Sequence, residues 1–80
     1  MHVLIIGAAG MVGRKLTERL VADGGLGGKE IARLTIADMF EPAAPAGFTG
    51  KVTTLVADLS EPGTAERLVA DRPDVIFHLA

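Results

Sequence analysis

The chain has 80 residues, of which 49% are hydrophobic and ten are glycine, and its formal net charge is −2. This length allows one small domain, and the scattered basic residues argue against a nucleic-acid or membrane partner. The absence of cysteine excludes disulfides and thiolate metal sites and fits a cytoplasmic protein. The apolar start is too short for a signal peptide or a membrane span.

A buried strand followed by an amphipathic helix is predicted at the start of the chain. Residues 3–6 are continuously apolar, as in a central parallel strand covered on both faces. In residues 11–22, Val12, Leu16 and Leu20 recur every four positions on one side of a helix. Asp23-Gly24-Gly25 is predicted to end that helix, because these residue types tolerate a left-handed backbone.

A second strand is predicted at residues 34–37, ending at Asp38, after a flexible glycine-containing connector at residues 26–31. Residues 40–50 contain two prolines and two glycines and are predicted to form a loop. Parallel neighbours normally need a crossover of about a dozen residues. We therefore expect the usual crossover helix to be absent here or reduced to a turn.

The last part of the chain is predicted to add a strand, a helix and a strand. The third strand covers residues 52–57, and Ser60 is a candidate N-cap for a helix with Pro62 in its first turn. Arg72-Pro73 should end this helix, and the fourth strand covers residues 75–79. The apolar stripe of the helix is expected to be Ala65, Leu68 and Val69. With right-handed crossovers, these elements give a Rossmann-type α/β fold with a parallel sheet in the order 3-2-1-4.

Three glycines lie where the first strand passes into the helix, and they favour a dinucleotide site. Gly7 would permit the tight turn, Gly10 the approach of a pyrophosphate, and Gly13 the close packing of the helix. The N–H groups of Met11 and Val12 are expected to face the phosphates. The alternative is an ordinary strand-to-helix turn that uses small residues, but the flanking strand, helix and downstream acid favour the dinucleotide.

Asp38 is the candidate acid for the ribose. It can accept hydrogen bonds from the ribose hydroxyls and would repel a 2′-phosphate, so NAD is favoured over NADP. It follows Gly7 by 31 residues, more than the usual spacing of about 20, because of the glycine-rich connector. The alternative is that Asp38 only caps a turn at the end of its strand.

Asp58 and Leu59 follow the third strand beside the expected adenine. The Asp58 carboxylate could accept from the adenine amino group while the Leu59 N–H serves a ring nitrogen, or Asp58 could simply cap the loop that leads to Ser60. His78 is expected to be a packed or hydrogen-bonded core residue, since the chain offers no cluster of metal ligands around it.

The segment Gly-Ala-Ala-Gly-Met-Val-Gly, Asp38, Ala57-Asp58-Leu59 and the closing Phe-His-Leu-Ala together resemble the extended short-chain dehydrogenase/reductase family. This family includes NAD-dependent epimerase/dehydratase enzymes that act on nucleotide sugars. The resemblance implies that Leu79 and Ala80 line the cofactor and that the pyrophosphate is held by Gly7, Gly10, Met11, Val12 and Gly13. The family motif usually opens with Thr-Gly. Here Ile6 replaces the Thr, which removes a hydroxyl contact but leaves the backbone cradle.

The resemblance implies an NAD-dependent oxidoreductase whose catalytic group is a Tyr followed four residues later by a Lys. The chain contains no tyrosine, so we expect no catalytic residue within it and no activity from it alone. We expect residues 1–80 to be the N-terminal part of an NAD-binding domain in a longer enzyme acting on a sugar acid or a nucleotide sugar, with a homodimer left open. The alternatives are a non-enzymatic NAD-sensing module and a truncated domain that binds no nucleotide.

Overall fold

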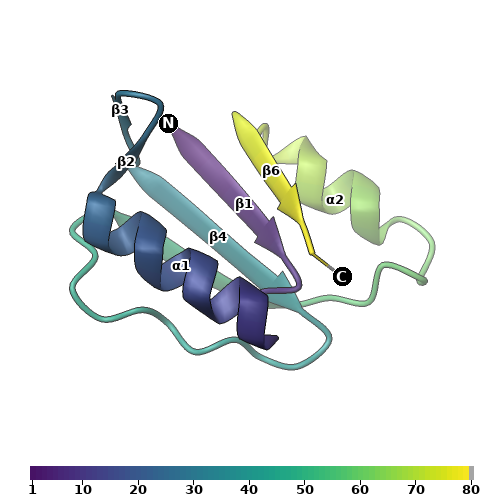
Figure 1. Ribbon diagram of the computed structural model, residues 1–80. Coiled ribbons are helices and arrows are strands. Elements are labelled where there is room, and N and C mark those ends of the chain that lie inside the picture. The colour runs from purple at the N-terminus through teal and green to yellow at the C-terminus, as the bar shows by residue number, and fades with distance from the viewer. Residues whose placement is uncertain (80) are drawn as a thin grey trace.

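The computed structural model describes residues 1–79 and contains one four-stranded parallel sheet with a helix on each face (Figure 1). The strand order is β5-β4-β1-β6, which confirms the predicted Rossmann-type order 3-2-1-4. The elements that build this layer structure are β1 (His2–Ile6), α1 (Met11–Asp23), β4 (Arg33–Asp38), β5 (Lys51–Val56), α2 (Thr64–Ala70) and β6 (Val75–His78).

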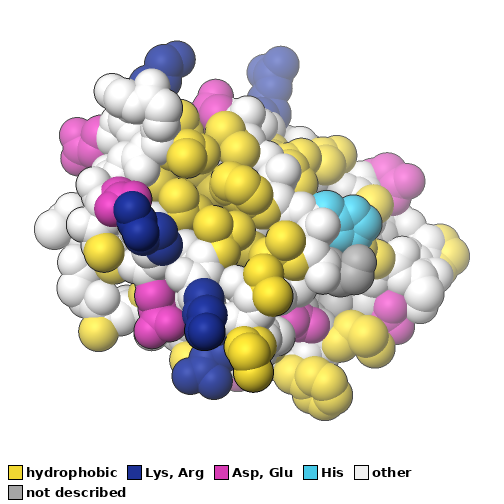
Figure 2. All heavy atoms as spheres, in the orientation of Figure 1, with side chains coloured by type: hydrophobic (Ala, Val, Ile, Leu, Met, Phe, Trp, Pro, Cys, Tyr) yellow, Lys and Arg dark blue, Asp and Glu magenta, His cyan; other side chains and the backbone are white. Residues whose placement is uncertain are grey.

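Alternating residues of the strands supply a hydrophobic core on each face of the sheet. Val3 and Ile5 of β1 pack on the side of α1, while Leu4 between them packs on the other side with Leu68 of α2. Val3, Leu4 and Ile5 are all fully buried, as predicted for a central strand. Figure 2 shows apolar side chains gathered on the sheet face between α1 and β6, where no helix of residues 1–79 covers the sheet.

Helix α1 ends as predicted but presents a different face to the sheet. Gly24 has a left-handed φ of 68° and donates its N–H to the Leu20 carbonyl at 2.9 Å. The predicted placement of Val12 in the apolar stripe is wrong, because its side chain is 67% exposed. The buried residues are Gly13, Thr17 and Leu20, so the packed face begins one residue later, at a position that has no side chain.

The connector after α1 is not the flexible segment that its glycines suggested. It forms a two-stranded antiparallel hairpin from β2 (Gly25–Leu26) and β3 (Lys29–Glu30). Gly27 and Gly28 occupy the turn with φ values of 59° and 82°. Two consecutive positive φ values are what a tight hairpin turn requires, and glycine adopts them without a steric penalty.

Residues 40–50 contain no helix, which confirms the prediction for the crossover between β4 and β5. The loop lies on the α1 side of the sheet: Pro42 is buried, and Phe48 packs against the core of that face. A cavity of about 650 Å³ separates α1 from the segment 43–47. The loop therefore covers the sheet face that a crossover helix would otherwise cover.

Helix α2 begins at Thr64, so the prediction of Ser60 as its N-cap is wrong. Gly63 takes the N-cap position with a positive φ of 85°, and residues 59–63 form turns instead of helix. The N–H and hydroxyl of Ser60 bond instead to the side chain of Asp58, two residues earlier. A local hydrogen bond of this kind competes with helix formation.

The predicted apolar stripe of α2 is only partly correct. Leu68 is buried, but Ala65 and Val69 are exposed, and Thr64 takes the second buried position. A helix of seven residues covers little of the sheet, which leaves part of this face open. Neither helix in residues 1–79 has the length and apolar character needed to cross a lipid bilayer.

Candidate functional site

The glycine turn lies at the carboxyl ends of the two central strands. Gly7 follows β1 with a φ of 90°, a conformation that favours glycine. The N–H groups of Gly7 and Ala8 both donate to the carbonyl oxygen of Ala37 in β4, at 2.9 Å and 3.2 Å. The turn is thus fixed to the neighbouring strand at the edge where ligands bind in open α/β sheets.

The other two glycines of the motif differ in what surrounds them. A Cβ added to Gly13 would lie 2.2 Å from the Gly7 oxygen and 2.7 Å from the Ala8 Cα, so α1 can lie this close to the turn only with glycine there. A Cβ on Gly10 would meet nothing closer than 3.6 Å. Packing within residues 1–79 therefore explains Gly13, whereas at Gly10 a Cβ would make only an ordinary van der Waals contact. A close approach of phosphate to the backbone is the remaining reason for glycine at position 10.

The N-terminus of α1 presents unpaired donors. The first bond of the helix joins the Arg14 N–H to the Gly10 carbonyl at 2.9 Å, so the N–H groups of Met11, Val12 and Gly13 precede it. Gly10 supplies no side-chain cap, and no acidic side chain lies in the first turn. The free N–H groups and the positive end of the helix dipole together suit an anion.

Asp38 is bound to the glycine turn through its carboxylate. Oδ2 accepts the Ala9 N–H at 2.8 Å, and Oδ1 accepts the Met39 N–H at 2.6 Å. Each oxygen retains a further lone pair for a hydroxyl donor. The contact to Met39 is of the turn-capping kind that was the alternative considered from the sequence. The contact to Ala9 was not anticipated, because residues 29 positions apart are brought together only by the pairing of β1 with β4.

Asp58 lies next to the same edge but is engaged locally. Its Oδ1 accepts the Ser60 N–H at 2.9 Å and the Ser60 hydroxyl at 2.7 Å. The hydroxyl bond, followed by the backbone bond, holds the pKa of the Asp58 carboxyl below its usual value. Ala57 donates its N–H to the carbonyl of Asp38, and Leu59 packs on the core beside α2. Asp58 therefore caps its own loop, and its predicted adenine contact stays a prediction.

The end of β6 brings Leu79 beside the glycine turn. The Leu79 N–H donates to the Ile6 carbonyl at 2.8 Å, one residue before Gly7, and the Leu79 side chain is 39% exposed. Ala80 lies outside the described residues, so its cofactor contact stays a prediction. The predicted core position of His78 is wrong: its side chain is exposed, and β6 is the outer strand of the sheet within residues 1–79.

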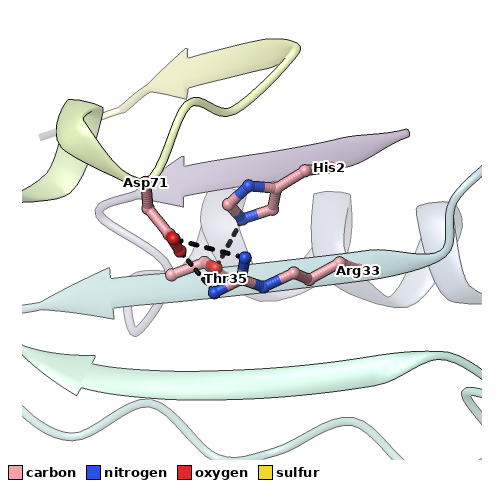
Figure 3. Close-up of polar contacts among 4 residues, drawn as sticks. All are labelled: His2, Arg33, Thr35 and Asp71. Atoms are coloured by element: carbon pink, nitrogen blue, oxygen red, sulfur yellow. Dashed lines mark hydrogen bonds and ion pairs between the residues drawn. The ribbon is translucent and has the colours of Figure 1, made fainter.

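A second polar cluster lies at the opposite edge of the sheet, where the strands begin (Figure 3). His2 is only 8% exposed, and its Nε2 lies 2.7 Å from the Thr35 hydroxyl. The Arg33 guanidinium forms an ion pair with both carboxylate oxygens of Asp71, which follows α2. The Arg33–Asp71 pair connects the end of α2 to the start of β4, and the His2–Thr35 contact connects β1 to β4. We assign both contacts to the scaffold.

A parallel sheet with a glycine turn, an open helix N-terminus and a strand-end acid defines a Rossmann-type nucleotide-binding domain. The chain belongs to the NAD dependent epimerase/dehydratase family, whose family model matches residues 3–80. NAD is the cofactor of this family.

Three relatives illustrate this membership. The chain is 35% identical over 85 residues to D-erythronate dehydrogenase from Cupriavidus necator, a match that covers 100% of this chain and 25% of that protein. It is 68% identical to a nucleoside-diphosphate-sugar epimerase of known structure from Agrobacterium tumefaciens, with a TM-score of 0.97 and coverage of 100% of this chain and 23% of that one. Uronate dehydrogenase from the same organism, solved with NAD, is 32% identical, with a TM-score of 0.67 and coverage of 98% and 25%. The chain thus spans about a quarter of the length of its relatives.

Proposed function

We propose that this chain is the NAD-binding part of an oxidoreductase acting on a sugar derivative. The observation that carries the proposal is the Asp38 carboxylate bound to Ala9, beside the open N-terminus of α1. In the proposed complex, the pyrophosphate lies against the N–H groups of Met11 and Val12 and close to the Gly10 backbone. The free lone pairs of Asp38 accept the adenosine ribose hydroxyls.

The choice of NAD over NADP rests on charge. A 2′-phosphate beside the Asp38 carboxylate would meet a like charge at about 4 Å, at a cost on the order of 1–4 kcal/mol. The two residues that follow, Met39 and Phe40, are 60% and 79% exposed and carry no cation that could offset this repulsion. We expect calorimetry to show NAD binding and little NADP binding, with Asp38→Ala weakening the affinity for NAD.

The chemistry of the bound nicotinamide is the acceptance of a hydride from a substrate carbon. The residues of this chain bind and orient the cofactor, and no described residue is assigned to proton transfer. The chain contains no tyrosine, so the family's tyrosine, which carries that step by resemblance, is absent from these 80 residues. The catalytic step is therefore assigned to the remainder of a longer protein.

The first candidate reaction is the oxidation of a sugar acid, such as D-erythronate, to its 2-oxo product. It is supported by the likeness to D-erythronate dehydrogenase and to uronate dehydrogenase. The second candidate is epimerisation of a nucleotide sugar, supported by the 68% identity to a nucleoside-diphosphate-sugar epimerase.

The two reactions differ in what happens to the electrons. A sugar-acid dehydrogenase releases NADH with each turnover, whereas an epimerase returns the hydride and leaves the NAD concentration unchanged. The longer protein that carries this chain should be given NAD with D-erythronate, with a uronic acid and with a nucleoside-diphosphate sugar. NADH accumulation with an acid supports the first candidate, and epimer formation without NADH supports the second. NAD binding with neither reaction would support the NAD-sensing module.

A further inference from the structure

Strand β5 is a free edge of the sheet. It pairs with β4, and within residues 1–79 no strand lies on its other side. The N–H groups of Lys51 and Ala57 both point toward β4, where they donate to the carbonyls of Ala32 and Asp38 at 3.0 Å and 2.8 Å. Because strand residues alternate in direction, the even-numbered residues between them turn their backbone N–H and C=O groups outward. These are Val52, Thr54 and Val56.

The side chains of this edge also favour pairing. Lys51 carries the only charge in β5, and the following residues are Val, Thr, Thr, Leu and Val, without proline or glycine. Leu55 and Val56 are 37% and 63% exposed. Protein edges usually carry central charges, prolines or bulges that prevent further pairing, and β5 has none of these beyond its first residue. Short uncharged segments rich in β-branched residues add readily to one another.

We propose that the free edge of β5 binds β5 of a second copy of this chain in antiparallel orientation. The charges at the two ends of the strand favour this partner and this direction. Antiparallel pairing brings Lys51 toward the partner's Asp58, which follows the far end of its strand, and so places opposite charges together. Parallel pairing in register would place Lys51 opposite the partner's Lys51, about 4.8 Å away, and like charges there are destabilising.

The outward backbone groups fix the register. A two-fold axis perpendicular to the sheet makes the two β5 strands antiparallel. It places side chains of the same sheet face opposite each other. All three outward residues find partners only when Thr54 faces the partner's Thr54 and Val52 faces the partner's Val56. In this register the two Lys51 residues lie about 20 Å apart, six residues along the strand. The two four-stranded sheets then become one continuous sheet.

A groove beside the edge accommodates side chains of the added strand. A cavity of about 520 Å³ lies between β5 and α2, lined by Thr53 and Leu55 of the strand and by Thr64 and Leu68 of the helix. In the proposed register the partner's Leu55 lies opposite Thr53, on the face that carries this cavity. Burial of the exposed Leu55 in both copies adds an apolar contribution to the backbone hydrogen bonds.

The first test separates the β5 edge from other surfaces by removing one outward donor. Thr54→Pro deletes an N–H that points away from β4, and Thr54→Ala keeps it and serves as the matched control. We expect the chain to dimerise in sedimentation velocity, Thr54→Ala to dimerise similarly, and Thr54→Pro to dimerise about tenfold more weakly, because the dimer loses two hydrogen bonds. Thermal unfolding by circular dichroism checks that both variants remain folded.

The second test reports the register. Since the chain has no cysteine, Thr54→Cys introduces a single thiol whose Cα would lie about 5.5 Å from its symmetry mate, within the range that a disulfide spans. Thr53→Cys is the control, because its mate would lie about 7–8 Å away. Under mild oxidation we expect Thr54→Cys to form covalent dimers at least several times faster than Thr53→Cys.

Three results would overturn the proposal. One is a chain that stays monomeric at all concentrations up to about 1 mM, because a dimer with a weaker Kd than this has negligible association energy. Another is a dimer that Thr54→Pro leaves unchanged, which would assign the contact to another surface, such as the apolar sheet face beside β6 in Figure 2. Equal cross-linking of the two cysteine variants would refute the register.

Discussion

Replacing Gly13 with alanine tests the close packing between α1 and the glycine turn. In an isolated helix this substitution would stabilise by up to about 1 kcal/mol. Here the new Cβ would lie 2.2 Å from the Gly7 oxygen and 2.7 Å from the Ala8 Cα, and both neighbours are backbone. Relief requires the start of α1 to move away from the turn by about 1 Å, and overpacking of this kind costs about 1–3 kcal/mol or more.

We expect a net loss of about 2 kcal/mol for Gly13→Ala, a large share of the roughly 4–12 kcal/mol that stabilises a domain of this size. The melting temperature should fall by about 8–16 °C. Thermal and urea unfolding should be followed by far-UV circular dichroism, because the chain has neither Trp nor Tyr.

Gly10→Ala is the matched control, since its Cβ would meet nothing closer than 3.6 Å and the residue has an ordinary φ of −73°. It should change stability by less than about 1 kcal/mol, yet weaken NAD binding by crowding the phosphate. Equal stability of Gly13→Ala and the parent chain would refute the packing argument. Unchanged NAD affinity in a folded Gly10→Ala variant would refute the proposed phosphate position.

Three further substitutions probe the ends of the elements. Asp38→Asn turns an amide group toward one of two backbone N–H donors, so we expect a loss of about 1–3 kcal/mol in urea unfolding even without NAD; an unchanged midpoint would show that the contact to Ala9 contributes nothing. Ser60→Ala should raise the pKa of Asp58 toward its ordinary value of 3.8 in an NMR titration. Because that pKa is lowered in the folded chain, the stabilisation lost in Ser60→Ala should be present above pH 3.8 and disappear as the pH falls through the folded pKa; a constant stability difference across this range would contradict it. Gly24→Ala forces alanine to a φ of 68° with free space around it, so thermal unfolding should report a loss of about 1–2 kcal/mol from backbone strain alone.

The parts of the fold that depend on neighbouring residues could be predicted from the sequence. The apolar run of β1, the glycine turn and the left-handed end of α1 each have local signals, and the strand order follows from right-handed crossovers. The absence of a helix from residues 40–50 was also predicted from a local signal, the prolines and glycines of that segment. The hairpin at Gly27 and Gly28 also had a local signal, two glycines between short flanks, which was interpreted as flexibility.

The parts that depend on distant residues could not be predicted in the same way. The bond from Ala9 to Asp38 requires the register that aligns Ile6 with Ala37, and no local pattern specifies it. The burial of His2 and the exposure of His78 depend on which strands lie at the edges of the sheet. Ser60 offered a good N-cap signal, but its N–H and hydroxyl both bond to Asp58, and α2 begins only at Thr64.

The contact between Asp38 and Ala9 limits how the cofactor preference of this protein can be re-engineered. Conversion to NADP would call for a small or cationic residue at position 38, yet that exchange also removes the acceptor that secures the Ala9 amide. A successful redesign must therefore supply a new acceptor for that amide elsewhere in the turn, or accept a less firmly held glycine turn along with the altered preference.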